Sequence, residues 1–440
     1  MKNIFAASVS ISAALLSVLL SGCSGQIVDQ TQGSAVMEMT TDSVTSTTTT
    51  TMPAVTTPPQ ITSGTTCTTI GANESIVENR LSSMTLKEKI YQLFIVTPEE
   101  LTHFSGSVTE AGNMTKSAVE TRPVGGVIYF SQNIESWQQT YQMLYNTQQY
   151  AQEANNGVGM FTAIDEEGGS VARIADKLGL YSSYDMEYYG KKEAYEEIYN
   201  LGNTIGTCMK DLGFNVNFAP VADVNINSDN ELGSRIFSDD PQIVSEMAAQ
   251  FVMGVEDTGV SATLKHFPGL GAGEGNTHDD SVLINRSYFE LKENEFEAFE
   301  GGIKAGVDFV MVGHQMVSAT LDNLPADLSP AAVNWLKFDN GFNGLIITDS
   351  HSMGAITRNY TPGEAAVLAL QAGVDIILMP YDLENAVDGI LSAVKNGDIT
   401  EERINESVRK ILSKKYNLGL IALKDSETTT ATAVTLEQWS

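Results

Sequence analysis

Cysteine is rare in this sequence, with 3 in 440 residues. Cys23 lies near the start, Cys67 follows a Thr-rich stretch and Cys208 falls in a segment with helical character. Isolated thiols do not make a disulfide framework, and none of the three has a CxxC partner that would predict a structural zinc site. HxH and HExxH motifs are also missing, so the spacing predicts no metal site.

Basic residues are also few, because 25 Lys and Arg stand against 55 Asp and Glu, for a formal net charge of −30. Nucleic-acid binding depends on basic patches, so this balance argues against nucleic-acid partners. It also indicates that any membrane contact does not come from surface electrostatics. We expect a monomer.

Long apolar runs are confined to the N-terminus. Lys2 precedes an apolar run at 4–20, as in a signal peptide, and the run ends in Leu-Ser-Gly before Cys23. This pattern resembles a bacterial lipobox and predicts a lipoprotein signal peptide over 1–22, with lipidation of Cys23. An ordinary signal peptide or a short membrane helix is the alternative. No later segment is apolar enough to cross a bilayer. The expected location is the extracytoplasmic face of the cell membrane, through a lipid anchor only.

Composition then divides the rest of the chain. Residues 23–73 are rich in Thr, Ser and Pro and predict a disordered tether, and 425–440 predict a disordered tail.

Between 74 and 424, apolar β-branched runs alternate with longer amphipathic segments. The runs are 93–96, 126–130, 161–164, 216–219, 262–264, 309–312, 345–348 and 376–379. We therefore predict an α/β fold of the (β/α)8 TIM-barrel type, as a single catalytic domain. A doubly wound open sheet is the alternative, but the glycine-rich stretch 269–275 does not satisfy GxGxxG.

Polar side chains follow many of these runs, where barrels of this type carry their active residues. They are Asp165, Asp223, Lys265, His266, His314, Asp349 and His351, and His278 lies on the glycine-rich loop that follows Lys265 and His266. Any one of them has a plain structural explanation, such as a helix cap or a satisfied hydrogen bond. Their convergence on one rim favours a site.

Asp349 is the sharpest of these candidates, because a buried apolar run delivers its carboxylate to the rim. A carboxylate on such a rigid base suits a nucleophile that attacks C1 of a sugar, and His278 is the best-placed proton donor. Lys265, His266 and Arg235 offer hydrogen bonds to sugar hydroxyls. Asp165 can accept a pair of them, and Glu167 with two glycines lets the backbone approach closely. A cation held by His266, His278 and Asp279 is a weaker alternative.

The motifs as a set resemble glycoside hydrolase family 3, in its β-N-acetylglucosaminidase branch. They are GGVIYF at 125–130, DEEGGSVAR at 165–173, NFAPVADV at 217–224, RIFS at 235–238, KHFPG at 265–269, DSHSMG at 349–354 and RINESV at 403–408. The resemblance implies a retaining enzyme with Asp349 as nucleophile and His278 as acid/base. It implies that Asp165, Arg235, Lys265, His266 and Met353 bind a terminal β-linked N-acetylglucosamine from peptidoglycan or chitin fragments. It implies no metal and no organic cofactor.

Two positions depart from the family pattern. Leu270 replaces a histidine after Pro-Gly, and Asn276 replaces the aspartate that supports the catalytic histidine. The Asn276 amide can orient the ring of His278 through its oxygen but supplies no charge, so we expect a weaker proton acceptor unless Asp279 compensates. A β-glucosidase, a phosphorolytic enzyme and a non-catalytic glycan-binding lipoprotein remain as alternatives.

Overall fold

The computed structural model describes residues 72–423. The predicted signal peptide, the lipidated Cys23, nearly all of the Thr-rich tether with Cys67, and the C-terminal tail lie outside the described residues. Within 72–423, no helix combines the length and the apolar character that a bilayer span requires.

An eight-stranded parallel sheet forms the centre of the described chain, in the order β6-β3-β2-β1-β12-β11-β9-β7. Bridges between Val216 and Ser261 and between Val221 and Lys265 join the two end strands, so the sheet closes on itself. The predicted (β/α)8 barrel is confirmed. Its strands are β1 (Phe94–Val96), β2 (Gly126–Ile128), β3 (Phe161–Ile164), β6 (Val216–Asn217), β7 (Thr263–Phe267), β9 (Phe309–Val312), β11 (Leu345–Ser350) and β12 (Ile376–Leu378).

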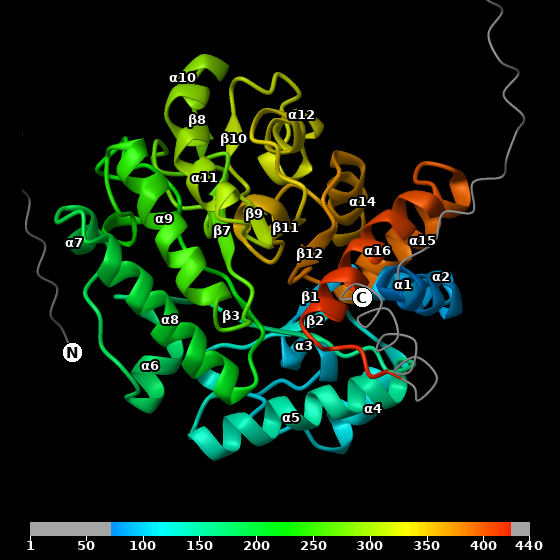
Figure 1. The fold of residues 1–440 in the computed structure, drawn as a ribbon. Coiled ribbons are helices and arrows are strands. Elements are labelled where there is room, and N and C mark those ends of the chain that lie inside the picture. Colours follow the sequence, from blue (N-terminus) through cyan, green and yellow to red (C-terminus); the bar gives the residue numbers. More distant parts are fainter. Residues whose placement is uncertain (1–71, 424–440) are drawn as a thin grey trace, which may run out of the picture. The chain divides into compact units, whose positions relative to one another are not determined.

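Helices surround the strands (Figure 1). They are α1 (Ala72–Ser83), α2 (Leu86–Tyr91), α3 (Pro98–Thr102), α4 (Asn113–Thr121), α5 (Trp137–Ala154), α6 (Arg173–Leu178), α7 (Met186–Gly190), α8 (Tyr195–Leu212), α9 (Pro241–Glu256), α10 (Tyr288–Glu293), α11 (Glu295–Lys304), α12 (Pro330–Asn334), α13 (Gly354–Thr357), α14 (Pro362–Ala372), α15 (Leu383–Asn396) and α16 (Glu401–Asn417). Side chains cap two of these helices: Thr85 and Glu88 form a capping box at α2, and Thr400 caps α16.

The core lies inside the barrel and between its strands and helices. The residues of β1, β3 and β9 are all buried, which explains why these strands are continuous apolar runs in the sequence. Phe161 of β3 and Phe309 of β9 meet edge to face, with ring centroids 5.5 Å apart, although their strands are not neighbours. Aromatic packing therefore fills the barrel and gives the strand ends a rigid base.

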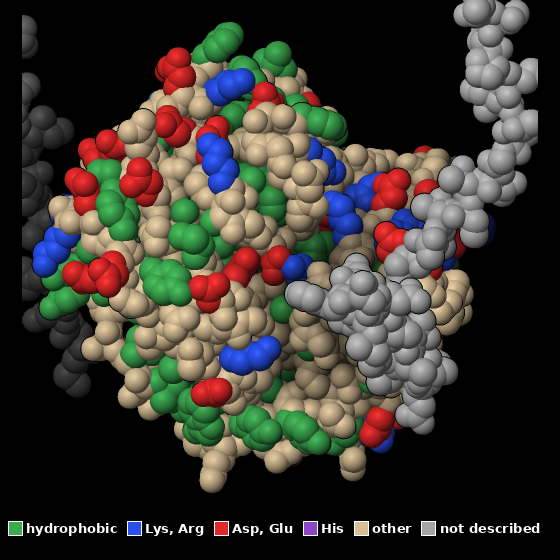
Figure 2. Space-filling view, in the orientation of Figure 1, with side chains coloured by type: hydrophobic (Ala, Val, Ile, Leu, Met, Phe, Trp, Pro, Cys, Tyr) green, Lys and Arg blue, Asp and Glu red, His purple; other side chains and the backbone are tan. Residues whose placement is uncertain are grey.

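Two short sheets lie outside the barrel. β4 (Glu166–Gly168) pairs antiparallel with β5 (Val171–Ala172) directly after β3. β8 (Leu283–Ile284) pairs with β10 (Met316–Val317) and ties together the segments that follow β7 and β9. Acidic and basic side chains are interspersed on the face that Figure 2 shows.

Candidate active site

Three of the predicted site residues share one rim of the barrel. Asp165 directly follows β3, Lys265 lies within β7 and Asp349 lies within β11. Because the strands are parallel, these positions all belong to the carboxyl-terminal edge of the sheet, where TIM barrels carry their active sites.

A network of buried ion pairs connects part of this rim. The Lys265 ammonium lies 2.9 Å from Asp165 Oδ1 and 2.7 Å from Glu167 Oε1. Arg235 binds Glu167 through two bonds, with Nη2 to Oε1 at 2.7 Å and Nε to Oε2 at 2.8 Å. Arg173 donates to Asp165 Oδ2 at 3.1 Å. The structure thus brings Asp165, Lys265 and Arg235 together, with Glu167 at the centre.

These pairs set the charges of the network. Burial alone would raise the pKa of Glu167, but Lys265 and Arg235 outweigh it and hold that pKa well below its usual range. Burial also opposes ionisation of Asp165, and Lys265 and Arg173 together lower its pKa. The pKa of Lys265 is raised in turn, because its two carboxylate partners outweigh the effect of burial. Five charged side chains therefore line this part of the rim, and they suit hydrogen bonding to a polyhydroxylated ligand.

Asp223 organises the segment that begins with His266. Its carboxylate accepts from His266 N at 3.0 Å, from His266 Nδ1 at 2.9 Å and from Leu270 N at 2.6 Å. The Nδ1 atom of His266 donates, which leaves Nε2 available for a ligand. Leu270, where the family pattern has histidine, is buried and contributes its backbone amide.

Asp349 differs from the other carboxylates of this rim. Among the described residues no cation forms an ion pair with it, and its Oδ1 accepts from the amide of Ser350 at 2.7 Å. Glu166, by contrast, is buried and caps α6 through the amides of Ile174 and Ala175. Asp349 is half-buried, so its second oxygen is free to react.

His278 lies on the loop between β7 and β8, and this loop is fastened to α13. The amide of Gly354 donates to His278 O at 3.0 Å, and the amide of Ala355 donates to Thr277 O at 3.2 Å. Glu231 holds the other side, since its Oε1 accepts from Thr277 N at 3.1 Å and from Thr277 Oγ1 at 2.8 Å. Because α13 begins five residues after Asp349, these bonds bring the loop to the segment that carries Asp349.

The ring of His278 is exposed and forms no hydrogen bond with the described residues. Asn276 does not orient it: Asn276 Oδ1 accepts from the backbone amide of His278, at 2.9 Å. The expectation that this amide orients the imidazole is therefore not met, because its oxygen is committed to the turn. Asp279 is exposed as well. Met353 is buried and occupies the cap position before α13.

Gly354 is where the loop and α13 come closest. A Cβ atom at Gly354 would lie 2.4 Å from Asp279 O and 2.7 Å from His278 O, so Gly354→Ala must push the loop away. We expect kcat to fall about 10- to 100-fold, because misplacement by about 1 Å has that effect on catalytic groups. We expect little change in Tm. Turnover assays and thermal unfolding measure the two quantities.

Gly112 provides a matched control for that variant. It too lies at the start of a helix, as the N-cap residue of α4 with a φ of −108°, and a Cβ there would meet nothing closer than 3.7 Å. Gly112→Ala should leave turnover unchanged. Equal losses in the two variants would show that the contact between the loop and α13 is not what positions His278.

The sequence did not predict Arg173 and Glu231 as site residues, and it gave Glu167 only a backbone role. Glu167 carries a signal, because it lies two residues after Asp165, the spacing that returns side chains to one face of an extended chain. The sequence gives no corresponding signal for Glu231, whose partner Thr277 is 46 residues away.

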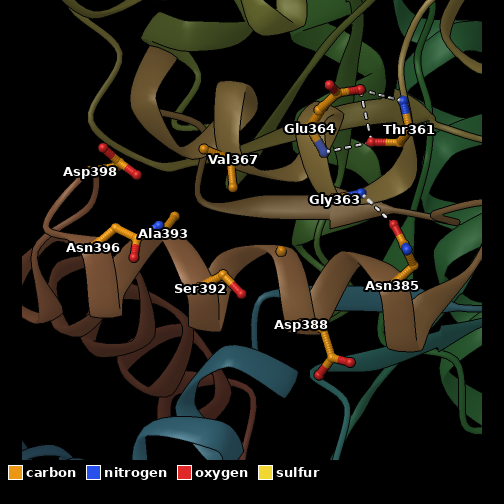
Figure 3. A pocket seen from close by; sticks show the side chains of 11 residues that line it. Thr361, Gly363, Glu364, Val367, Asn385, Asp388, Ser392, Ala393, Asn396 and Asp398 are labelled. Carbon is orange, nitrogen blue, oxygen red and sulfur yellow. Dashed lines mark hydrogen bonds between the residues drawn. The ribbon is translucent and has the colours of Figure 1, made fainter.

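A surface pocket between α14 and α15 lies apart from this site (Figure 3). Its lining includes Thr361 and Glu364 of the α14 cap, and Asn385, which accepts from the Gly363 amide at 3.0 Å. None of the predicted site residues lines it, so we assign it no part in the chemistry.

Comparison with known proteins identifies the family. The model for the glycosyl hydrolase family 3 N terminal domain matches residues 85–414. The chain belongs to glycosyl hydrolase family 3, as its motifs indicate.

Individual relatives agree with this assignment. The chain is 31% identical over 262 residues to "Beta-hexosaminidase LpqI" of Mycobacterium tuberculosis, covering 58% of this chain and 67% of that protein. It is 28% identical over 320 residues to "Beta-hexosaminidase A" of Pseudoalteromonas piscicida, covering 67% of this chain and 54% of that protein. Among solved structures, a family 3 β-N-acetylglucosaminidase from Paenibacillus sp. str. FPU-7 superposes with a TM-score of 0.72 at 31% identity, covering 79% of this chain and 68% of that one. The chain thus spans about half to two thirds of these relatives.

Proposed function

We propose that this chain is a retaining exo-glycosidase that removes terminal β-linked N-acetylglucosamine from cell-wall or chitin-type oligosaccharides. The observation that carries the proposal is that one carboxylate oxygen of Asp349 has no bonding partner among the described residues. Other carboxylates on the rim, namely Asp165, Glu166, Glu167 and Asp223, are engaged by cations, helix amides or the backbone. Asp349 alone among these combines a rigid strand, partial exposure and an unpaired oxygen.

The reaction divides into two steps in this account. Asp349 attacks C1 of the sugar, and the bond from C1 to the leaving oxygen breaks as His278 gives that oxygen a proton. Water then attacks C1 of the glycosyl ester and passes a proton to His278, and the Asp349 carboxylate is released. Lys265, Arg235 and Asp165 hold the sugar hydroxyls through both steps.

Support for N-acetylglucosamine as the sugar comes from the relatives, several of which are named β-hexosaminidase or β-N-acetylglucosaminidase. One relative, from Cellulomonas fimi, is named "Beta-N-acetylglucosaminidase/beta-glucosidase" at 28% identity. A plain β-glucoside is therefore the second candidate substrate.

An aryl-glycoside panel tests the proposal. Nitrophenyl β-N-acetylglucosaminide, β-glucoside and β-N-acetylgalactosaminide are compared by kcat/KM, with and without phosphate. We expect the highest value for the N-acetylglucosaminide and no acceleration by phosphate. A higher kcat/KM for the glucoside would indicate a β-glucosidase. Acceleration by phosphate would indicate phosphorolysis. No turnover of any substrate would contradict the proposal.

A further inference from the structure

Three buried side chains lie directly behind the segment that carries Asp349. His314 follows β9, Asp327 belongs to the short helix η3 (Ala326–Leu328), and His351 follows β11. Their exposed fractions are 1%, 0% and 2%. His314 Nδ1 lies 2.8 Å from Asp327 Oδ2, and His351 Nε2 lies 2.9 Å from the same oxygen. We call these residues the His–Asp–His cluster.

The hydrogen bonds of His314 determine its protonation. Its Nδ1 faces the Asp327 carboxylate, and its Nε2 lies 2.8 Å from the backbone oxygen of Ser350. Both partners only accept, so both ring nitrogens carry hydrogen and the ring is an imidazolium. Burial alone would lower the pKa of His314, but Asp327 outweighs burial and raises it to about 9.

His351 is neutral, whereas His314 is protonated. Its Nε2 donates to Asp327, whereas its buried Nδ1 has no hydrogen-bond partner in the described chain. A neutral ring with hydrogen on Nε2 satisfies this geometry, and burial lowers the pKa of His351 despite the nearby carboxylate. The cluster therefore combines one cation, one anion and one neutral histidine.

The bond to Ser350 connects the cluster to the reacting group, because Ser350 is the residue after Asp349 and its own amide donates to Asp349 Oδ1 at 2.7 Å. Lys265, Arg173 and Arg235 are all paired with Asp165 or Glu167. His314 is paired with Asp327 as well, but its second ring nitrogen is bonded to the Ser350 carbonyl, so among the described residues this cation lies beside the segment that carries Asp349.

We propose that His314, held protonated by Asp327, is a positioning residue for the nucleophile. Its charged hydrogen bond fixes the Ser350 carbonyl and hence the direction of the Asp349 carboxylate. Its positive charge attracts the Asp349 carboxylate, the group that attacks. This inference rests on the proposed function, since Asp349 is its nucleophile.

The charged and titratable groups around His314 come from several elements. Asp327 faces it from η3, Asp349 from β11 and His351 from the turn after β11. Tyr360, ahead of α14, and Asp322, ahead of η3, are the more remote neighbours of this group. Among these groups, Asp327 is the one whose side chain forms a hydrogen bond with His314, and the ring of His351 lies beside it with centroids 5.7 Å apart.

The acid limb of the pH profile of kcat/KM tests the proposal. His314→Gln keeps a donor but carries no charge, and Asp327→Asn removes the charge that keeps His314 protonated. In Asp327→Asn, which removes the anion together with the cation, the acid limb should move up by less than one pH unit. In His314→Gln it should move up by about one pH unit, the effect expected of losing one nearby opposite charge. At pH values below the limb, kcat/KM should fall about tenfold, mainly through kcat.

His351→Gln is the matched control, because it disturbs a hydrogen bond to the same Asp327 oxygen without removing a charge. Its acid limb should stay in place, whatever it does to Tm. An unmoved limb in folded His314→Gln and Asp327→Asn would overturn the proposal, as would a shift of the same size in His351→Gln. Inactivity of the wild-type protein on every substrate would instead refute the proposed function.

Nitrogen-15 NMR of the imidazoles gives a readout that does not depend on turnover. The chain has only five histidines, so the variants assign the signals. His314 should show two protonated nitrogens at pH 7 and lose a proton near pH 9. Since its pKa is raised on folding, its contribution to stability is complete below about pH 6.5 and is lost as the pH rises through about 9. A neutral His314 at pH 7 would overturn the proposal. The ligand atoms of the three side chains lie within 4.8 Å of one another. Binding of one equivalent of zinc by these side chains would therefore overturn the proposal as well.

Discussion

Replacing Asp349 by asparagine is expected to lower kcat on the aryl N-acetylglucosaminide by a factor on the order of 10⁴ or more, as losing a nucleophile does in other enzymes. The amide cannot form the glycosyl ester, and the rim offers no other carboxylate that is free to replace it. Tm should change little, because Asp349 has no ion pair to lose among the described residues and its one bond, from the Ser350 amide, can be kept by the amide oxygen. Steady-state turnover and thermal unfolding measure the two effects.

Azide separates a lost nucleophile from a damaged fold. In Asp349→Ala, azide can enter the space that the carboxylate leaves and attack C1, giving a glycosyl azide of inverted configuration. Rescue with that product supports Asp349 as the nucleophile. Near-normal hydrolysis by Asp349→Asn would contradict it and would point to the substrate's own acetamido oxygen as the attacking group.

The His278→Ala variant should show the second large effect, and its size should depend on the leaving group. A natural disaccharide needs a proton on its leaving oxygen, so kcat/KM should fall about 10²- to 10⁴-fold, the range of general acid catalysis. Nitrophenolate leaves without a proton, so the first step on the aryl substrate should be much less affected. Measuring both substrates over a range of pH also shows whether the basic limb disappears with the imidazole.

Thr277→Val is the neighbouring control for that experiment. It removes the side-chain bond to Glu231 but keeps the ring, so losses on the two substrates should be similar. A similar loss on both substrates in His278→Ala would count against His278 as the acid. No loss on the disaccharide would exclude His278 from proton transfer.

The barrel could be predicted because each strand is a short buried run between amphipathic segments. All eight predicted runs contain or overlap a strand, and 161–164 and 309–312 match β3 and β9 in full. The residues at which these strands end could be predicted less well. β7 extends to Phe267 and β11 to Ser350, so Lys265 and Asp349 lie inside strands, although their polar side chains predict that the strands end before them. Pairing with a neighbouring strand continues both beyond their apolar runs, because Phe267 pairs with Val312 and Ser350 with Leu378.

The site was predictable only as a set of strand-end positions. Asp165, Lys265 and Asp349 follow from strand order, because parallel strands end on one rim. Their pairing does not, since the partners Lys265 and Asp165 are 100 residues apart. For the same reason Glu167 was assigned only a backbone role, although its side chain binds both Lys265 and Arg235.

Asn276 shows a different limit of prediction from the sequence. Its substitution for aspartate was visible in the sequence, but the group that its oxygen contacts was not. An Asn side chain two residues before an amide often closes a local turn, and here this local bond replaces contact with the ring. The support of the His278 imidazole therefore depends on substrate or on movement of the loop, which the disaccharide assay reports.

Trapping the intermediate tests the central claim most directly. A fluorinated N-acetylglucosaminyl fluoride, whose ring fluorine slows both steps and whose leaving group favours the first, is incubated with the enzyme, and the digest is examined by mass spectrometry. The account predicts one sugar attached to the peptide that contains Asp349 and no label in Asp349→Asn. A label on another carboxylate, or none in an enzyme that turns over the aryl substrate, would contradict it.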